Sequence, residues 1–204
     1  MRLYLVILLV LVTLLSIASP VSANDPLLVY YDGPESALKT ALNLDASVQF
    51  VREPSSADVI VLAGALTDPG SIRKLVEAGK GLILIANPGF TASDLSSLLG
   101  EPVILKEQTE PLSLSPVKGV PDALLTEIFW TSSPQIRERM VISGGGFNPL
   151  VLGFEDNSLV LGTRTLGAGS VYLFTGELGD ANPQFQEWTY FNYLFHHLAQ
   201  RASR

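Results

Sequence analysis

The chain has 204 residues, none of which is cysteine, and it has only two histidines. Without cysteine there is no disulfide, no thiol nucleophile and no thiolate ligand for a metal ion. The two histidines, His196 and His197, are adjacent, and on a helix their side chains would point about 100° apart. Two ligands so placed do not chelate one ion well, so we expect one histidine to be packed and the other solvated. The sequence therefore predicts neither a metal site nor a cofactor.

Basic clusters and nucleotide-binding motifs are also missing. The chain has 13 Lys and Arg residues against 20 Asp and Glu residues, and its formal net charge is −7 at pH 7. Nucleic acids and anionic membrane surfaces attract basic patches, so neither is an expected partner. No GxGxxG motif follows the first predicted strand and no P-loop occurs, which leaves dinucleotide and nucleotide binding without support.

A long apolar run occurs only at the N-terminus. Leu3 to Ala18 follows a single arginine and precedes Val21-Ser22-Ala23, a run of small residues. This pattern is typical of a secretory signal peptide, so we predict a signal peptide at 1–23, cleavage after Ala23 and one domain at 24–204. The alternative is an uncleaved membrane anchor, although the run is shorter than the ~20 residues that span a bilayer. The signal peptide predicts an exported protein, whether secreted, periplasmic or at the cell surface, whereas the anchor predicts a protein tethered to the membrane.

Strands and helices alternate through the first half of the chain. Apolar runs predict strands at 27–31, 47–51, 58–63 and 82–86, and helical spacing predicts helices at 35–44, 68–78 and 94–99. Such alternation favours a parallel sheet with right-handed crossovers and helices on both faces. The sequence therefore predicts an α/β fold with three layers, in the flavodoxin-like class.

The second half has a less regular pattern. Five prolines punctuate 100–146, which we interpret as an insertion or a lid-like excursion with short strands at 103–106, 112–114 and 139–143 and a helical turn at 120–125. Strands are then predicted at 149–154, 158–164 and 170–175, as an antiparallel meander at one edge of the sheet.

One aromatic helix, at 183–202, is predicted to close the fold. Trp188, Phe191, Phe195 and Leu198 lie at i, i+3, i+7 and i+10, which is one continuous helical stripe. This stripe either packs on the sheet or forms a surface on which sugars stack, and we favour core packing. Phe129 and Trp130, in the irregular middle segment, are candidates for an exposed rim.

Three stretches carry a resemblance to a known family. They are Leu75-Val76-Glu77-Ala78-Gly79-Lys80-Gly81-Leu82-Ile83-Leu84, then 166–177, and Trp188-Thr189-Tyr190-Phe191-Asn192-Tyr193-Leu194. With the order of elements above, they resemble class I glutamine amidotransferase-like domains, and most closely the exported, non-catalytic members found beside ABC-transporter and membrane-protein genes. The resemblance covers nearly all of 24–204 and implies one flavodoxin-like domain.

The resemblance also implies where a catalytic site would lie. Active amidotransferases carry a cysteine in a GxCxG elbow, and the matching residues here are Ile85-Ala86-Asn87-Pro88-Gly89, with Asn87 in place of the nucleophile. The family's His-Pro-Glu segment matches Thr175-Gly176-Glu177, so Thr175 replaces the base while Glu177 keeps the acid. An amide has no ionisable nucleophile, so we expect no glutaminase activity.

A candidate ligand cleft is predicted at the same edge of the sheet, because loops after parallel strands converge there. Its predicted residues are Asp32, Gly33, Gly64, Asn87, Pro88, Gly89, Glu177 and Asp180. Paired carboxylates from this set would serve as acid and base or would bind a cation; otherwise they are solvated loop acids and helix caps, which we favour.

Three hypotheses follow. The first is a non-catalytic binding or scaffold module outside the cytoplasm, whose partner is a membrane protein such as a transporter, or a cell-surface glycan. The second is an extracytoplasmic hydrolase that uses the loop carboxylates. The third is a structural subunit without a ligand, which a cleft filled by Phe90 or by the middle segment would favour.

Overall fold

The computed structural model describes residues 25–120 and 122–204, so the predicted signal peptide lies outside the described residues. The strands are β1 (Leu27–Asp32), β2 (Val48–Val51), β3 (Val59–Leu62), β4 (Gly81–Ile85), β5 (Val103–Gln108), β6 (Leu114–Pro116), β7 (Arg139–Gly144), β8 (Asn148–Gly153), β9 (Leu159–Leu166) and β10 (Gly169–Phe174). The helices are α2 (Ala37–Asn43), α3 (Pro69–Glu77), α4 (Ala92–Leu99), α5 (Ala123–Glu127), α6 (Pro183–Gln186) and α7 (Phe191–Ala202), with short 3₁₀ turns η1 (Pro54–Ser56) and η2 (Trp130–Ser132). The predicted α/β fold class is confirmed.

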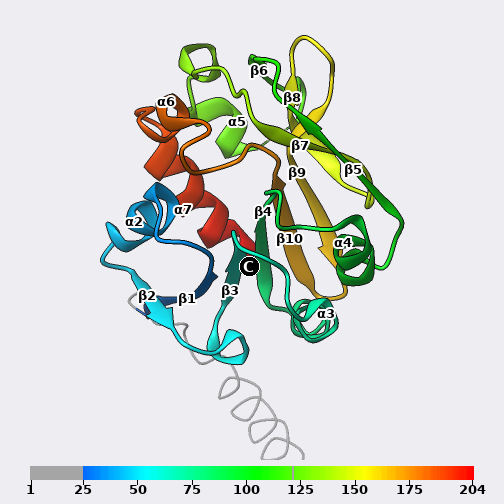
Figure 1. Cartoon of the computed structure of the whole chain (residues 1–204). Helices are drawn as coiled ribbons and strands as arrows, with labels where there is room; N and C mark the ends of the chain where they lie inside the picture. The colour runs from blue at the N-terminus through cyan, green and yellow to red at the C-terminus, as the bar shows by residue number, and fades with distance from the viewer. Residues whose placement is uncertain (1–24, 121) are drawn as a thin grey trace, which may run out of the picture.

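An eight-stranded sheet in the order β2-β1-β3-β4-β10-β9-β8-β6 forms the centre of the molecule (Figure 1). The first five strands in this order are parallel, and β9, β8 and β6 extend the sheet in antiparallel fashion. The predicted meander therefore needs one correction. Strand β10 is not at the edge but pairs with β4 on one side and β9 on the other, because hydrophobic alternation reveals a strand without revealing its partners.

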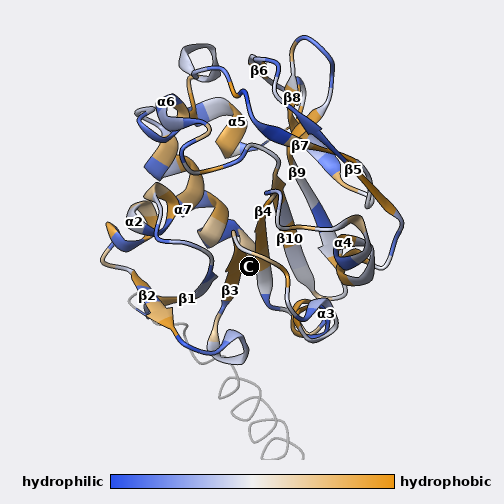
Figure 2. Cartoon of the chain, viewed as in Figure 1, coloured by the Kyte–Doolittle hydropathy of each residue, from blue (hydrophilic) through white to orange (hydrophobic). Residues whose placement is uncertain are grey.

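Alternate residues of the central strands face two separate cores. Val61 and Ile83 lie in the core beneath α2 and α7, whereas Ile60 and Leu82 lie in the core beneath α3 and α4. All four are at most 1% exposed, and the two central strands are coloured as strongly hydrophobic in Figure 2. This burial on both faces explains why these strands are apolar without a break.

Residues 100–146 do not form a lid. Strands β5 and β7 pair in antiparallel fashion as a separate two-stranded sheet, and Val103, Met140 and Ile142 pack into the core on the α4 side. Strand β6 completes the main sheet beside β8. Among the described residues, Pro102 directly precedes β5 and Pro116 is the last residue of β6, positions at which a missing N–H group is tolerated.

The predicted C-terminal helix is two helices, α6 and α7, separated at 187–190. Phe191 and Phe195 are at most 1% exposed, so the core interpretation of the aromatic stripe is correct. Trp188 lies outside α7 but is also buried, with its ring 5.6 Å from that of Trp130. Trp130 was expected at an exposed rim, but it packs into the core and is 4% exposed, with its Nε1 donating to the Leu124 carbonyl at 3.1 Å; Phe129 is 65% exposed. None of the described helices has the length and apolar character needed to span a membrane.

Candidate functional site

The carboxyl ends of β1, β3, β4 and β10 are adjacent, because these strands are parallel neighbours in the sheet. The loops that carry the predicted site residues therefore begin at one edge. The backbone N–H of Ala86, just before Asn87, donates to the Phe174 carbonyl at 2.9 Å, so the loops after β4 and β10 begin side by side. The two positions matched to a nucleophile and a base, Asn87 and Thr175, follow directly.

Asn87 is held by hydrogen bonds within the loops. Its side-chain Nδ2 lies 3.2 Å from each of the carbonyl oxygens of Ala63, Gly64 and Ile85. Its Oδ1 accepts from the Gly89 N–H at 2.7 Å, which closes the turn after β4. Both ends of the amide are thus engaged in joining the loop after β4 to the loop after β3. We call Asn87 with these partners the Asn87 lock.

Two glycines let the loops after β1 and β3 approach one another. A Cβ atom at Gly33 would lie 2.9 Å from the Ala63 Cβ, and one at Gly64 would lie 3.2 Å from the Gly33 Cα. The Gly89 position is also tight, because a Cβ there would meet the Asn87 Oδ1 at 2.8 Å. All three predicted cleft glycines are therefore explained by close packing, while Pro88 is exposed on the same turn.

Thr175 is completely buried and its hydroxyl donates to the Leu159 carbonyl at 2.9 Å. Its backbone N–H donates to Val160, and its carbonyl accepts from the Met140 N–H at 3.0 Å. The side chain is thus used within the sheet, toward β9 and away from solvent. A buried threonine with its hydroxyl satisfied by a backbone carbonyl cannot serve as a general base.

Glu177 lies in a different environment from Asn87. Burial raises the pKa of its carboxyl, and the nearby charges of Glu138 and Glu107 raise that pKa further. The loop that carries Glu177 is fastened by Asn182, whose Nδ2 donates to the carbonyls of Glu138 and Glu177 at 2.8 and 2.9 Å. Asp180, in the same loop, is exposed. The predicted cleft residues therefore form two groups, one joined through Asn87 and one joined through Asn182.

Asp32 lines a hollow of about 160 Å³ at the carboxyl ends of β1 and β3. Leu62, Leu66 and Ile72 form its apolar floor, and they are at most 8% exposed. Tyr30 and Asp68 stand at its rim with Asp32. Neither Asn87 nor Glu177 contributes to this hollow. Phe90 is not among the residues that line this hollow.

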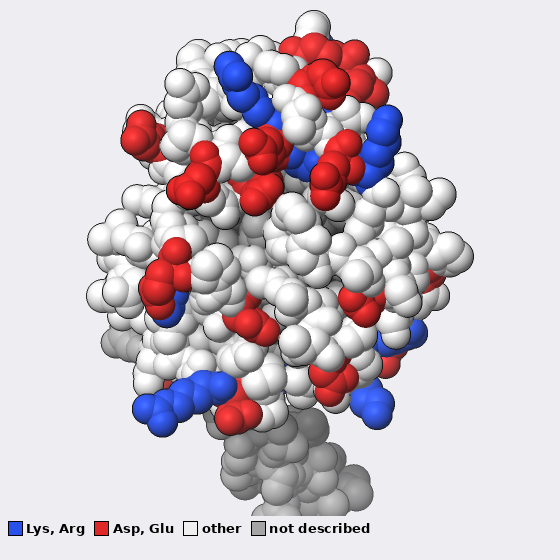
Figure 3. All heavy atoms as spheres, viewed as in Figure 1, with Lys and Arg blue, Asp and Glu red and all other residues white. Residues whose placement is uncertain are grey.

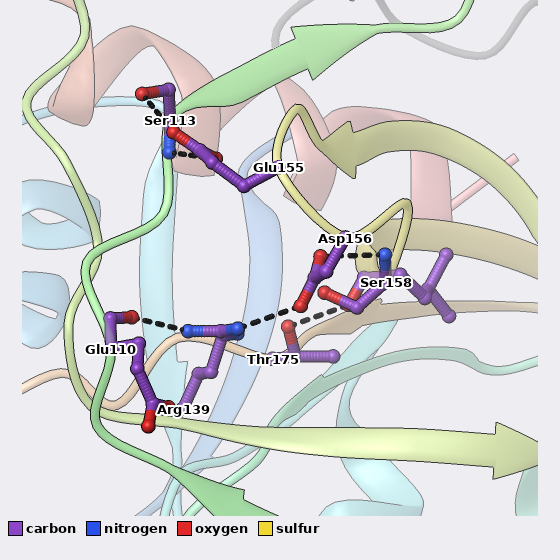
Figure 4. A network of polar contacts seen from close by, with 8 residues as sticks. Glu110, Ser113, Arg139, Glu155, Asp156, Ser158 and Thr175 are labelled. Atoms are coloured by element: carbon purple, nitrogen blue, oxygen red, sulfur yellow. Dashed lines mark hydrogen bonds and ion pairs between the residues drawn. The ribbon is translucent and has the colours of Figure 1, made fainter.

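Sequence reasoning missed a second polar network, which is built around Arg139 (Figure 4). The Arg139 side chain is 3% exposed, and its guanidinium donates to the Glu110 carbonyl at 2.7 Å and to the Asp156 carboxylate at 2.8 Å. Partial burial pushes the pKa of Asp156 upward, but hydrogen bonds from Ser158 and Arg139 outweigh it and hold the pKa below its usual value. A lone arginine at the start of a predicted strand gives no sign of such a partner.

The network continues along the same turn. Glu155 accepts from the Ser113 N–H and hydroxyl at 2.8 and 2.7 Å, and these bonds, the hydroxyl foremost, lower its pKa. Residues 155–156 thus bond to both Ser113 and Arg139 of β7, so the turn between β8 and β9 holds these two segments together. Arg139 Nε is buried without a hydrogen-bond partner in the described structure.

Charge and metal ligands can be assessed over the rest of the described chain. Figure 3 shows acidic side chains spread over the viewed face, with basic side chains at fewer places. No group of three or more His, Asp or Glu residues among the described positions is arranged to hold a metal ion. His196 contacts the Asp45 carboxylate at 3.0 Å, and the ring of His197 stacks on Tyr193 with centroids 5.4 Å apart.

Comparison with known proteins supports the fold only. Neither a family model nor a curated protein sequence matches the chain. A cytoplasmic protein of Salmonella typhimurium LT2 is similar in structure, with a TM-score of 0.69 and 14% identity over 87% of this chain and 99% of that one. A second cytoplasmic protein of Salmonella typhimurium has a TM-score of 0.67 and 14% identity over 86% of this chain and 98% of that one. A cold-adapted β-galactosidase from Rahnella sp. R3 matches 92% of this chain at 15% identity and a TM-score of 0.57, but only 33% of that enzyme is covered.

The expectation of export, or of a membrane-tethered form, is corrected by these comparisons. The two Salmonella structures, of which 99% and 98% are covered, are named cytoplasmic proteins. The expectation rested on the composition of residues 1–23, which lie outside the described structure. An apolar run followed by small residues is a compositional signal that is independent of the fold in 25–204, so it has no support from the rest of the molecule.

Proposed function

We propose that the chain is a non-catalytic binding or scaffold module with an amidotransferase-like architecture. The observation that carries this proposal is the use made of the two vacated positions. Both ends of the Asn87 amide are hydrogen-bonded to backbone groups, and the Thr175 hydroxyl donates to the Leu159 carbonyl. Neither side chain can act as a nucleophile or a base without first breaking these bonds.

The sugar-stacking version of this proposal loses its main candidate surface. Phe191, Phe195 and Trp188 are buried within one aromatic cluster, so their faces are not available to a glycan. The acidic character of the chain also disfavours nucleic acid as a partner. We therefore propose that binding uses the loops at the carboxyl edge of the sheet.

A carboxylate hydrolase is the second candidate, and Glu177 is the observation that favours it. Its pKa is raised by burial and by the charges of Glu138 and Glu107, and a raised carboxyl pKa suits a general acid. The alternative explanation is that Glu177 is a loop residue without a catalytic role, whose pKa is raised because other acidic residues lie near it. Only measured turnover separates the two explanations.

The test is a turnover assay with matched variants. Wild type, Asn87→Ala and Glu177→Gln are assayed for ammonia release from glutamine and for hydrolysis of chromogenic glycosides and esters. The binding-module proposal predicts that all three proteins stay at the buffer background. Turnover that copurifies with the protein and disappears in Glu177→Gln would establish the hydrolase instead, and turnover lost in Asn87→Ala would overturn the reading of Asn87.

A further inference from the structure

The hollow lined by Asp32 lies at a special point of the sheet. Strand β1 stands between β2 and β3, so the chain leaves β1 toward one side for β2 and returns to the other side for β3. In open α/β sheets, ligands bind outside the carboxyl ends of strands at such a switch in strand order. The hollow is bounded by Asp32 at the end of β1, Leu62 at the end of β3 and the first turn of α3.

Two polar groups of the hollow lack hydrogen-bond partners among the described residues. No described residue donates a hydrogen bond to the Asp32 carboxylate, and none bonds to the Tyr30 hydroxyl. Asp68, by contrast, is exposed and caps α3 by accepting from the Ser71 N–H at 3.0 Å through Oδ1. The unbonded Asp32 carboxylate also contrasts with Asn87, where both ends of the side chain are bonded.

The charge of the hollow has one sign. Asp32 and Asp68 carry carboxylates, and no lysine or arginine is among the described residues that line it. Burial raises the pKa of Tyr30, and the charges of Asp32 and Glu53 raise it further, so the phenol stays protonated at neutral pH. An anion at the start of α3 would meet these carboxylates, and the capping position there is already occupied by Asp68.

The size and floor of the hollow limit the ligand further. A cavity of roughly 150 Å³ is enough for a molecule as large as benzene, and this hollow measures about 160 Å³. Its floor is aliphatic, formed by Leu62, Leu66 and Ile72, and the hydroxyls of Thr67 and Ser71 belong to its rim. A short apolar body with one cationic end fits this arrangement, since the body covers the floor and the charge meets the carboxylates.

We propose that the hollow between β1, β3 and α3 binds a small alkylammonium ion, with Asp32 and Asp68 as its charged partners. The apolar part lies over Leu62, Leu66 and Ile72, and the Tyr30 ring borders the cation. This inference rests on the proposed binding function and names the class of ligand. It does not depend on turnover, so the two proposals can fail separately: the turnover assay tests catalysis, and the experiment below tests only this hollow.

The experiment is a titration of the ¹⁵N-labelled protein with three probes of similar shape: n-butylammonium, 1-butanol and butyrate. The proposal predicts saturable shifts of the amides in 30–32 and 62–72 with n-butylammonium, much weaker binding of 1-butanol and none of butyrate. Asp32→Asn should weaken n-butylammonium at least tenfold, and Tyr30→Phe should weaken it less. Asp180→Asn, which removes an exposed loop acid elsewhere, should leave the affinity unchanged.

Three results would overturn the proposal. One is the absence of saturable shifts with n-butylammonium. Another is equal weakening by Asp32→Asn and Asp180→Asn, which would mean a general attraction of cations to an acidic protein. The last is 1-butanol binding as tightly as the cation, which would mean an apolar hollow without charge recognition. If Asp32→Asn does not fold, Tyr30→Phe and the three-probe comparison on wild type still decide.

Discussion

Asn87 follows β4 and Asp32 ends β1, at the same carboxyl edge of the sheet with β3 between them, yet their side chains are used in opposite ways. The Asn87 amide bonds to backbone groups of the loops after β3 and β4. The Asp32 carboxylate borders a hollow and accepts no hydrogen bond from the described residues. A polar group whose bonds are all made inside the protein stabilises the fold, whereas one left open beside a cavity is available to a ligand. Position on the sheet alone does not distinguish the two.

The largest effect on stability is expected in the aromatic core, where side chains serve the fold alone, as we infer for Asn87. Phe191→Ala should lower the free energy of unfolding by ~3–5 kcal/mol, the usual cost of truncating a large buried aromatic. The Phe191 ring is 1% exposed and lies 4.9 Å from Phe195, centroid to centroid. Urea unfolding measures the change. Phe154→Ala is the control, because Phe154 is 73% exposed and its truncation should have little effect; similar losses in both variants would mean that α7 is not a core helix.

Arg139 should come next in magnitude. Arg139→Met should cost about 2 kcal/mol at neutral pH, because hydrogen bonds of charged groups contribute ~1.5–3 kcal/mol. Arg137→Met is the matched control, since Arg137 is exposed and its side chain bonds to no described residue. A loss of stability confined to Arg139→Met would show that the network of Figure 4 stabilises the fold. Equal losses in both variants would show that it does not.

The same variant should change the pH dependence of stability. The pKa of Asp156 is lower in the folded protein than in the unfolded chain, with Arg139 among the causes. The stability that Asp156 contributes is therefore present above its unfolded pKa of about 3.9 and is lost as the pH falls through its folded pKa. The difference between wild type and Arg139→Met should shrink in acid, as urea unfolding at several pH values would measure. A difference that grows as the pH falls would contradict the assigned sign.

Asn87→Ala sharpens the comparison directly. It should cost ~1–3 kcal/mol, because it leaves loop carbonyls and the Gly89 N–H without partners. Asp32→Asn should stay within about 0.5 kcal/mol of wild type, as surface changes without bonded partners usually do. Thermal and urea unfolding of the two variants side by side would show whether they differ. Equal changes in the free energy of unfolding would mean that Asn87 and Asp32 do not differ in how much they stabilise the fold.

Glu177→Gln is expected to have the smallest effect, and of opposite sign. The folded pKa of Glu177 is raised, so its contribution is favourable at low pH and is lost as the pH rises through that folded pKa. At neutral pH the variant should be slightly more stable than wild type, within about 0.5 kcal/mol, because solvent screens the repulsion at this half-buried carboxylate. The two proteins should converge in acid. A variant less stable than wild type at neutral pH would indicate a bonded role for this carboxylate.

Local patterns in the sequence predict the first half of the fold well. The cap at Asp68 with Pro69 behind it marks the start of α3, and the unbroken apolar run marks β4. Pairing across long distances is not encoded in such patterns, so the place of β10 between β4 and β9 and the pairing of β5 with β7 were missed. Trp130 was misplaced because a tryptophan in an irregular segment looks exposed until its partners, Leu124 and Trp188, are known.

The candidate site was predictable only as a set of loops. Convergence of strand ends placed Asp32, Gly64 and Asn87 at one edge, as the parallel order of β1, β3 and β4 requires. Whether an amide is bonded or open depends on carbonyls that are 23 and 24 residues away in the chain, at Gly64 and Ala63. For the same reason Arg139 gave no sign of its partners at Glu110 and Asp156, and the hollow gave no sign of its aliphatic floor.

The Asn87 lock can be observed directly through the hydrogen exchange of its side-chain amide. The NH₂ resonances are assigned by their loss in Asn87→Asp, and their exchange is compared with that of Asn192, which is exposed. Donation to the loop carbonyls predicts marked protection of the Asn87 amide and an Asn192 amide that exchanges like a free one. If the two amides exchange equally fast, the Asn87 side chain is open to solvent and does not form the Asn87 lock. The contrast between a bonded Asn87 and an unbonded Asp32 would then be wrong.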